Sequence, residues 1–255
     1  MNILFIGDVV GDKGCDFLEK KIYSIKKDYD IALTVINGEN SALGNGITPY
    51  SYNRLVSLGA DVITTGNHCF RRRESLSLYD EHTTLLRPAN FPEGVAGHGY
   101  TVADLGFAQV AVINLMGTAY MEPLDNPFFC IDRILESIDT QNIIVDFHAE
   151  ATSEKKAMGF YLDGRVTAVL GTHTHVQTAD ETILPKGTAY ITDAGMTGAE
   201  LSVLGVKSEL AIDKIKYHAP VKFEESENPC FLNGVIVEFD EFKGKANKII
   251  RIIER

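Results

Sequence analysis

Residues 171–175 read Gly-Thr-His-Thr-His, and the apolar run Val-Thr-Ala-Val-Leu at 166–170 leads directly into them. A short apolar run of this kind is typical of a buried β-strand. Where the chain stays extended, residues two apart point to the same side, so His173 and His175 can face one cleft. The stretch therefore predicts a strand of a layered fold that delivers two imidazoles at its carboxyl end.

Four earlier apolar runs end in the same way, with polar side chains after them. The expected strands are Asn2–Gly7, Ile31–Ile36, Asp61–Thr65 and Ile143–Phe147, and the polar residues that follow them are Asp8, Glu39 with Asn40, Asn67 with His68, and His148. In layered α/β proteins, sites form outside the carboxyl ends of strands, where several loops meet. We therefore expect these residues to share one site with His173 and His175.

Helical patterns alternate with the apolar runs, which predicts an α/β fold. The other expected elements are a turn at Gly11–Gly14, helices at Phe17–Lys27, Thr48–Leu58 and Ile131–Ile138, a β-hairpin within residues 99–115, and strands at Gly234–Phe239 and Lys248–Ile253. No internal repeat or linker divides the sequence. We expect residues 1–255 to form a single domain of two packed sheets with helices outside.

The composition is that of an acidic globular protein. Of its 255 residues, 45% are hydrophobic and 23% are charged, and the formal net charge is −11. This charge disfavours binding to duplex nucleic acid or to an anionic membrane. No apolar stretch reaches the roughly 20 residues that span a bilayer. The four cysteines are scattered, with no Cys-x-x-Cys pair, which indicates a reducing compartment and predicts a cytoplasmic protein.

The residue types that follow the strands suit a metal site. Three imidazoles, two carboxylates and amide carbonyls favour Fe, Mn or Zn, and the absence of thiolates disfavours a soft-metal site. A bridging carboxylate can hold two metals roughly 3.5–4 Å apart, and such a pair binds phosphate oxygens and deprotonates a bridging water that attacks phosphorus. A histidine beside the metals would then protonate the leaving alkoxide.

Together with longer stretches, these motifs resemble a known family. The matching motifs are Gly7-Asp8, Gly38-Glu39-Asn40, Gly66-Asn67-His68, His148 and Gly171–His175, with stretches such as NILFIGDVVG, RPANFPEG, DFHAEATSEK and ILPKGTAYITD. They are similar to those of the YmdB-type bacterial phosphodiesterases, within the calcineurin-like metallophosphoesterase superfamily. The resemblance runs from residue 2 to about residue 198.

The resemblance implies a four-layer αββα sandwich with a dinuclear metal site, and iron is the metal it favours over Mn or Zn. It assigns the first ion to Asp8, Glu39, Asn40 and His175. It assigns the second ion to Glu39, Asn67, His148 and His173, so that Glu39 bridges the two. The residue matching His68 is the proton donor to the leaving group.

We therefore expect a phosphodiesterase that hydrolyses small cyclic nucleotides, 2′,3′-cyclic ones included and 3′,5′-cyclic ones as a further class. A metal-bridging hydroxide would attack, and His68 would donate the proton. The resemblance also implies a homo-oligomer and partners in RNA turnover. Two alternatives stay open: a phosphomonoesterase or nucleotidase that uses the same site, and a metal-containing regulatory binding module with little turnover.

Some residues keep two interpretations. The relatives commonly continue Thr-Trp-Asp after the residue matching His68, whereas this chain has Cys69-Phe70-Arg71, a change that affects either the orientation of His68 or the substrate. The run Arg71–Arg73 is either a phosphate or RNA contact or a solvated helix start. Glu150 and Asp193 are either groups that orient an imidazole or solvated carboxylates.

Overall fold

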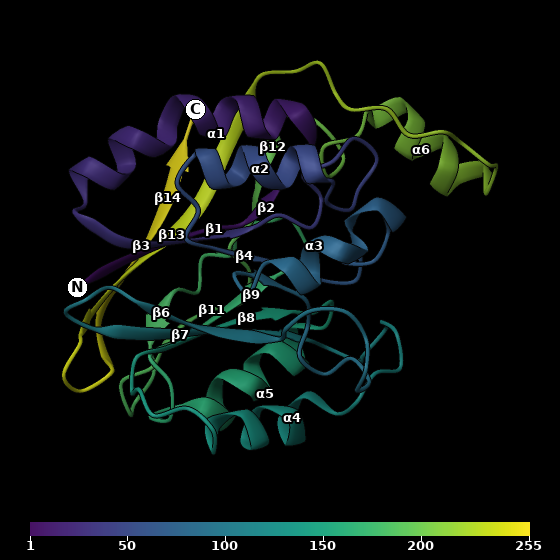
Figure 1. Ribbon diagram of the computed structural model, residues 1–255. Helices are drawn as coiled ribbons and strands as arrows, with labels where there is room; N and C mark the ends of the chain where they lie inside the picture. The colour runs from purple at the N-terminus through teal and green to yellow at the C-terminus, as the bar shows by residue number, and fades with distance from the viewer.

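Two β-sheets lie face to face in the computed structural model, which describes residues 1–255, and helices cover their outer faces (Figure 1). The first sheet has eight strands in the order β2-β12-β13-β1-β3-β4-β5, with β14 paired to β13. These strands are β1 (Asn2–Ile6), β2 (Asp8–Val9), β3 (Ile31–Asn37), β4 (Val62–Thr64), β5 (Leu85–Leu86), β12 (Met196–Ala199), β13 (Cys230–Asp240) and β14 (Lys245–Glu254). β1, β3, β4 and β5 are parallel, so their carboxyl ends lie at one edge.

The second sheet has six strands in the order β10-β11-β9-β8-β7-β6. They are β6 (Tyr100–Asp104), β7 (Gln109–Met116), β8 (Ile143–His148), β9 (Ala168–Thr172), β10 (Thr182–Ile183) and β11 (Ala189–Ile191). β7, β8, β9 and β11 are parallel to one another. The antiparallel pair β6–β7 is the hairpin that the sequence predicts.

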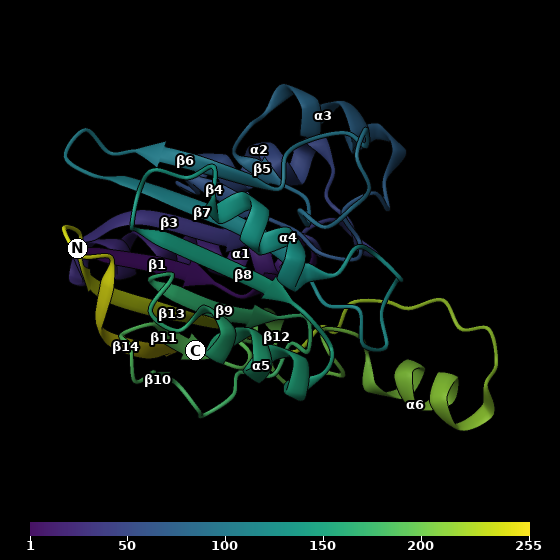
Figure 2. The same ribbon diagram turned by 90° about the horizontal axis from the view of Figure 1, so that it is seen from below.

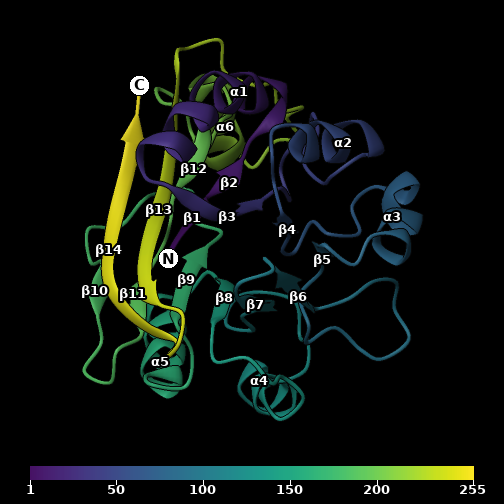
Figure 3. The same ribbon diagram turned by 60° about the vertical axis from the view of Figure 1, so that its left-hand side comes forward.

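Helices complete the two outer layers (Figures 2 and 3). α1 (Gly11–Asp28) and α2 (Pro49–Ser57) cover the first sheet, and α4 (Pro127–Leu135) and α5 (Thr152–Leu162) cover the second. A 3₁₀ turn at Arg73–Ser75 leads into α3 (Leu76–Glu81), and α6 (Ser208–Tyr217) projects away from the layers (Figure 1). No helix is both long enough and apolar enough to cross a membrane. The four-layer αββα sandwich expected from the resemblance is confirmed.

Three apolar cores separate the four layers. Side chains alternate between the two faces of a strand, so Ile3 and Phe5 of β1 pack between the sheets while Leu4 and Ile6 pack under the helices. The third core lies between the second sheet and its helices and includes Met158 of α5. Burying a large apolar side chain stabilises a fold by roughly 1.5–3 kcal/mol, so these cores fix the sheets that carry the polar strand ends.

The start of α1 differs from the expectation. The sequence predicts a turn at Gly11–Gly14 before the helix, but both glycines lie within its first turn. At Gly14 the absence of a side chain lets the helix approach the backbone carbonyl of Thr197 in β12, which a Cβ would overlap. Gly14 therefore permits close packing of a helix on a strand. By contrast, the predicted start of α2 is confirmed, because Thr48 Oγ1 accepts a hydrogen bond from Ser51 N at 3.2 Å and Pro49 follows the cap.

Candidate metal centre

The structure brings together all seven residues that the sequence proposed as ligands. We refer to them as the cage: Asp8, Glu39, Asn40, Asn67, His148, His173 and His175. Each lies at or just after the carboxyl end of a strand, and the strands come from both sheets. The cage therefore lies at the edge where the two sheets meet.

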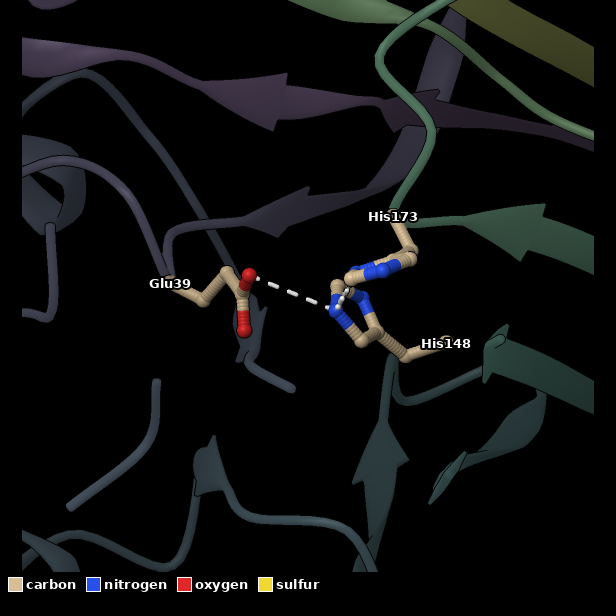
Figure 4. Close-up of side chains that lie close together, drawn as sticks. All are labelled: Glu39, His148 and His173. Carbon is tan, nitrogen blue, oxygen red and sulfur yellow. Dashed lines mark hydrogen bonds and ion pairs between the residues drawn. The ribbon is translucent and has the colours of Figure 1, made fainter. Parts of the chain in front are cut away.

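Glu39 and two imidazoles form the closest group (Figure 4). His148 Nε2 lies 3.3 Å from Glu39 Oε1 and 3.0 Å from His173 Nδ1. Asn67 Oδ1 lies 3.0 Å from the same His148 nitrogen. One oxygen or nitrogen from each of Glu39, His148 and His173 falls within 4.8 Å of the others. Ligands of one ion at about 2 Å from it would have such spacings.

A second group of candidate ligands also contacts Glu39. Asn40 Nδ2 is 3.2 Å from Glu39 Oε1, 3.1 Å from Asp8 Oδ1 and 3.3 Å from His175 Nε2. His175 Nε2 is also 3.5 Å from Asp8 Oδ1. Glu39 therefore contacts members of both groups, which matches the arrangement expected of a bridging carboxylate.

His68 lies beside the cage. Its Nδ1 is 3.0 Å from Asn40 Oδ1 and 3.2 Å from Glu39 Oε1, and its backbone N–H donates to Glu39 Oε2 at 3.1 Å. Its Nε2 points away from these contacts and lies 3.4 Å from Asn45 Nδ2. The side chain is 26% exposed, whereas that of His148 is fully buried. His68 therefore presents one ring nitrogen to the cage and the other to the space outside it.

The residues of the cage fit a metal. Asp8 and Glu39 are at most 1% exposed, and neither forms an ion pair with a lysine or an arginine. Burying two carboxylates without a cation is costly, and imidazoles are the only groups facing them that can carry a positive charge. In addition, His175 Nδ1 is buried without a hydrogen-bond partner. Carboxylate, amide and imidazole donors of this kind suit Fe, Mn or Zn.

The charged groups of the cage shift one another's pKa values. Burial disfavours the ionised carboxyl of Glu39, but His148 and His68 hold its pKa well below the usual range. Burial also disfavours a charged His148, yet Glu39 and Asp8 raise the pKa of His148 to about 9. Burial opposes charge on Asp8 and His175 as well, but their attraction lowers the pKa of Asp8 and raises that of His175. Protons thus balance the carboxylates in the ion-free protein, and a metal would displace them.

Glu150 and Asp193 contact the segment that carries His173 and His175. Glu150 Oε2 is 3.1 Å from His173 Nε2, so this carboxylate orients the imidazole whose other nitrogen faces His148. Asp193 Oδ2 accepts hydrogen bonds from Thr174 N at 3.0 Å and Thr174 Oγ1 at 2.8 Å. It also pairs with Lys155 Nζ at 2.7 Å, and both side chains are at most 1% exposed. No sequence pattern points to Lys155, because a lysine on a helix usually faces solvent.

The unusual segment after His68 has a packing role. Cys69 is 1% exposed, and the Phe70 ring packs edge-on against Tyr79 and Phe91, with centroids 5.3 and 5.4 Å away. Arg72 donates to the backbone oxygen of Asn45 at 2.9 Å and also contacts the oxygen of Leu43. Arg72 therefore holds the loop whose Asn45 side chain approaches His68, whereas Arg71 and Arg73 are exposed.

Known proteins are similar to this chain over nearly its whole length. Residues 4–252 match the family described as YmdB-like protein. The chain belongs to this family. It is 49% identical over 255 residues to a Bacillus subtilis protein named 2′,3′-cyclic-nucleotide 2′-phosphodiesterase, and the match covers 99% of this chain and 97% of that protein.

Two crystal structures of similar proteins have nearly the same fold as this member of the YmdB-like family. One is described as a novel phosphatase from Mycoplasma pneumoniae, with 37% identity, a TM-score of 0.94 and coverage of 100% of this chain and 94% of that one. The other is a hypothetical protein from Thermus thermophilus, with 38% identity, a TM-score of 0.94 and coverage of 99% and 98%. The resemblance read from the motifs is confirmed over the whole chain.

Proposed function

We propose that the chain is a metal-dependent phosphodiesterase that hydrolyses 2′,3′-cyclic nucleotides, and 3′,5′-cyclic nucleotides more slowly. The observation that carries the proposal is the position of Glu39, whose carboxylate contacts both groups of candidate ligands at 3.2–3.3 Å. The 49% identity to the Bacillus subtilis protein supports phosphoric ester hydrolysis as the class of reaction.

The two ligand groups support a site for two ions, with iron favoured and Mn or Zn as the other metals of suitable chemistry. Asp8, Asn40 and His175 would hold one ion, and Asn67, His148 and His173 the other, with Glu39 shared. When bound, such a pair supplies a polarised phosphate and an activated water. The histidines around it must then be unprotonated on the nitrogens that face the ions.

His68 has the geometry of a proton donor. Its Nδ1 is engaged by Asn40 and Glu39, so the proton available to a substrate is the one on Nε2. That nitrogen lies outside the cage on a side chain that is partly exposed, as a general acid for a leaving ribose oxygen requires. Asn45, held near Nε2 by the loop that Arg72 braces, can contact the same leaving group.

A substrate panel tests the proposal. The protein reconstituted with Mn²⁺ or Fe²⁺ is assayed with 2′,3′-cAMP, 3′,5′-cAMP and 5′-AMP, and products are separated by liquid chromatography. We expect 2′,3′-cAMP to be hydrolysed fastest and to give 3′-AMP, because the bond to the 2′ oxygen is the one expected to break. Faster hydrolysis of 5′-AMP than of either cyclic substrate would favour a phosphomonoesterase. No turnover by a chain with both ions bound would favour a regulatory module.

We also propose that the chain is a cytoplasmic homo-oligomer with partners in RNA turnover. Homo-oligomerisation is measured by light scattering during size-exclusion chromatography of the full chain. A cytoplasmic location and partners in RNA turnover require measurements in cells. We propose the seven cage residues as ligands and His68 as the acid on the geometry given above.

A further inference from the structure

Asp146 is a buried carboxylate placed between the two sheets, close behind the cage. It lies on β8 two residues before His148, and its side chain is fully buried. Its Oδ2 accepts hydrogen bonds from Asn37 Nδ2 at 3.0 Å and from Thr64 Oγ1, and its Oδ1 accepts one from Thr172 Oγ1 at 2.7 Å. No lysine or arginine contacts it, so its only partners are neutral donors.

Each of these partners leads to a member of the cage. Asn37 is the last residue of β3, and its Oδ1 accepts a hydrogen bond from the backbone N–H of Glu39 at 3.2 Å. Thr64 is the last residue of β4, three positions before Asn67. Because β3 and β4 belong to the first sheet and β8 to the second, Asp146 joins the two sheets at the edge where the cage lies.

Thr172 connects Asp146 to His148. The Thr172 hydroxyl has one proton, and it donates this proton to Asp146 Oδ1. The same oxygen lies 2.9 Å from His148 Nδ1, so it must accept there and His148 must carry a proton on Nδ1. That proton leaves Nε2 as the ligand atom, and Nε2 is the nitrogen that faces Asn67 and His173. The chain of hydrogen bonds therefore selects the tautomer that a metal needs.

We propose that Asp146 is a positioning residue for metal binding, which fixes Glu39 through Asn37 and His148 through Thr172. The inference rests on the two-ion site proposed above. It assigns a larger effect to the ion held by Asn67, His148 and His173, because the contacts of Asp146 lead mainly to that group. Asp146 is not itself one of the proposed ligands.

Mn²⁺ binding to the full chain tests the inference. We compare the wild type with Asp146→Asn by equilibrium dialysis against Mn²⁺, with metal content measured by elemental analysis. The amide keeps the size of the side chain. It places an N–H₂ group where a carboxylate oxygen accepts hydrogen bonds, so one set of these bonds is lost. Changes to groups that orient ligands typically cost 10–100-fold in affinity. We therefore expect one of two Mn²⁺ ions to bind about 10–100-fold more weakly.

Variants at two further positions separate positioning from folding. Asp163 is also buried, and its Oδ1 and Oδ2 accept the backbone N–H of Lys186 at 3.1 and 3.0 Å, but it precedes β9 at the end away from the cage. Asp163→Asn should lower the melting temperature without changing Mn²⁺ affinity. At Thr172, the isosteric Thr172→Val change should weaken Mn²⁺ binding, and Thr172→Ser, which restores the hydroxyl, should recover it.

The outcomes distinguish the inference from the proposed function. If the wild type binds two ions and Asp146→Asn binds both equally well, the positioning role is overturned while the two-ion site stands. Equal losses of affinity in Asp146→Asn and Asp163→Asn would also overturn it, because the effect would then be one of stability. A wild type that binds no Mn²⁺ would overturn the metal site and the inference with it.

Discussion

At the scale of single residues, the cage leaves no room for a side chain at Gly66. A Cβ at this position would overlap the imidazole of His148 and the carboxylate of Glu39. We predict that Gly66→Ala lowers Mn²⁺ affinity about 10–100-fold, since overpacking of about 1–3 kcal/mol would act directly on two ligands. Equilibrium dialysis measures this change.

Gly159→Ala is the matched control for Gly66→Ala. The added Cβ would meet the Tyr190 ring at 2.5 Å in the core beneath α5 rather than in the cage. We expect this variant to melt at a lower temperature but to bind Mn²⁺ with unchanged affinity. If Gly66→Ala and the wild type bind Mn²⁺ with the same affinity, the prediction is wrong and the cage can expand to fit the added Cβ.

For His68 we predict a loss of activity without a loss of metal. Because it lies beside the cage and is not proposed as a ligand, His68→Ala should keep its metal content. General acid catalysis typically contributes about 10²–10⁴-fold, so kcat for 2′,3′-cAMP should fall within that range. His98→Ala serves as the control, since His98 is an exposed loop histidine. Unchanged turnover in His68→Ala would remove this residue from the mechanism.

At the scale of elements, the segment after β9 holds two of the proposed ligands in a strained conformation. The φ angles of His173 and His175 are 100° and 64°, in the left-handed region that non-glycine residues rarely adopt. Such residues cost of order 1–3 kcal/mol each and persist only where their surroundings hold them. Here the hydrogen bonds from Thr174 to Asp193 do so, and Lys155 neutralises the buried carboxylate.

Lys155→Met should therefore be strongly destabilising. It leaves Asp193 buried without its cation, and removing one partner of a buried pair typically costs about 3–5 kcal/mol of the free energy of unfolding. Urea denaturation of the ion-free chain measures this loss. The double variant Lys155→Met with Asp193→Asn has no buried charge and should lose less than Lys155→Met alone. A double variant that is less stable than the single one would contradict this account of the pair.

The elements differ in how well the sequence predicts them. β8 and β9 are apolar runs that end in polar residues, so their ends could be located and their histidines grouped. α5 has no such signal, because its buried face includes the charged Lys155 and the small Gly159. In α6 only Ala211 is buried, so no apolar stripe marks that helix. Prediction succeeds where burial follows hydrophobicity and fails where a helix buries a charge or buries almost nothing.

At the scale of the whole molecule, the cage is assembled by contacts between sheets that no local pattern reveals. Asn37 and Asp146 are 109 residues apart in the sequence and meet at 3.0 Å. The motifs identified the candidate ligands because each lies at or just after the end of a strand. The residues that support them, such as Thr172 and Asn37, resemble ordinary strand residues in the sequence. Their role is set by which strands become neighbours across the two sheets, and no local pattern in the sequence reveals those neighbours.

The same assembly makes the stability of the protein depend on pH and on metal together. In the ion-free chain the pKa of His148 is raised from 6.5 to about 9. The stabilisation from its charged form is complete below pH 6.5 and is lost as the pH rises through about 9. His175, whose pKa is also raised, changes stability in the same direction. We therefore predict that the melting temperature of the ion-free chain falls between pH 6.5 and pH 9.

Bound metal should oppose this fall in melting temperature. A metal needs the unprotonated His148 nitrogen, so its affinity increases as the pH rises, and tighter binding to the folded state adds to stability. Calorimetry with and without saturating Mn²⁺, under anaerobic conditions, should show a gain in melting temperature that is larger at pH 9 than at pH 6.5. In His148→Gln, which cannot titrate at this position, the dependence on pH should be weaker in both states. An ion-free wild type that becomes more stable over this range would contradict the charge balance described for the cage.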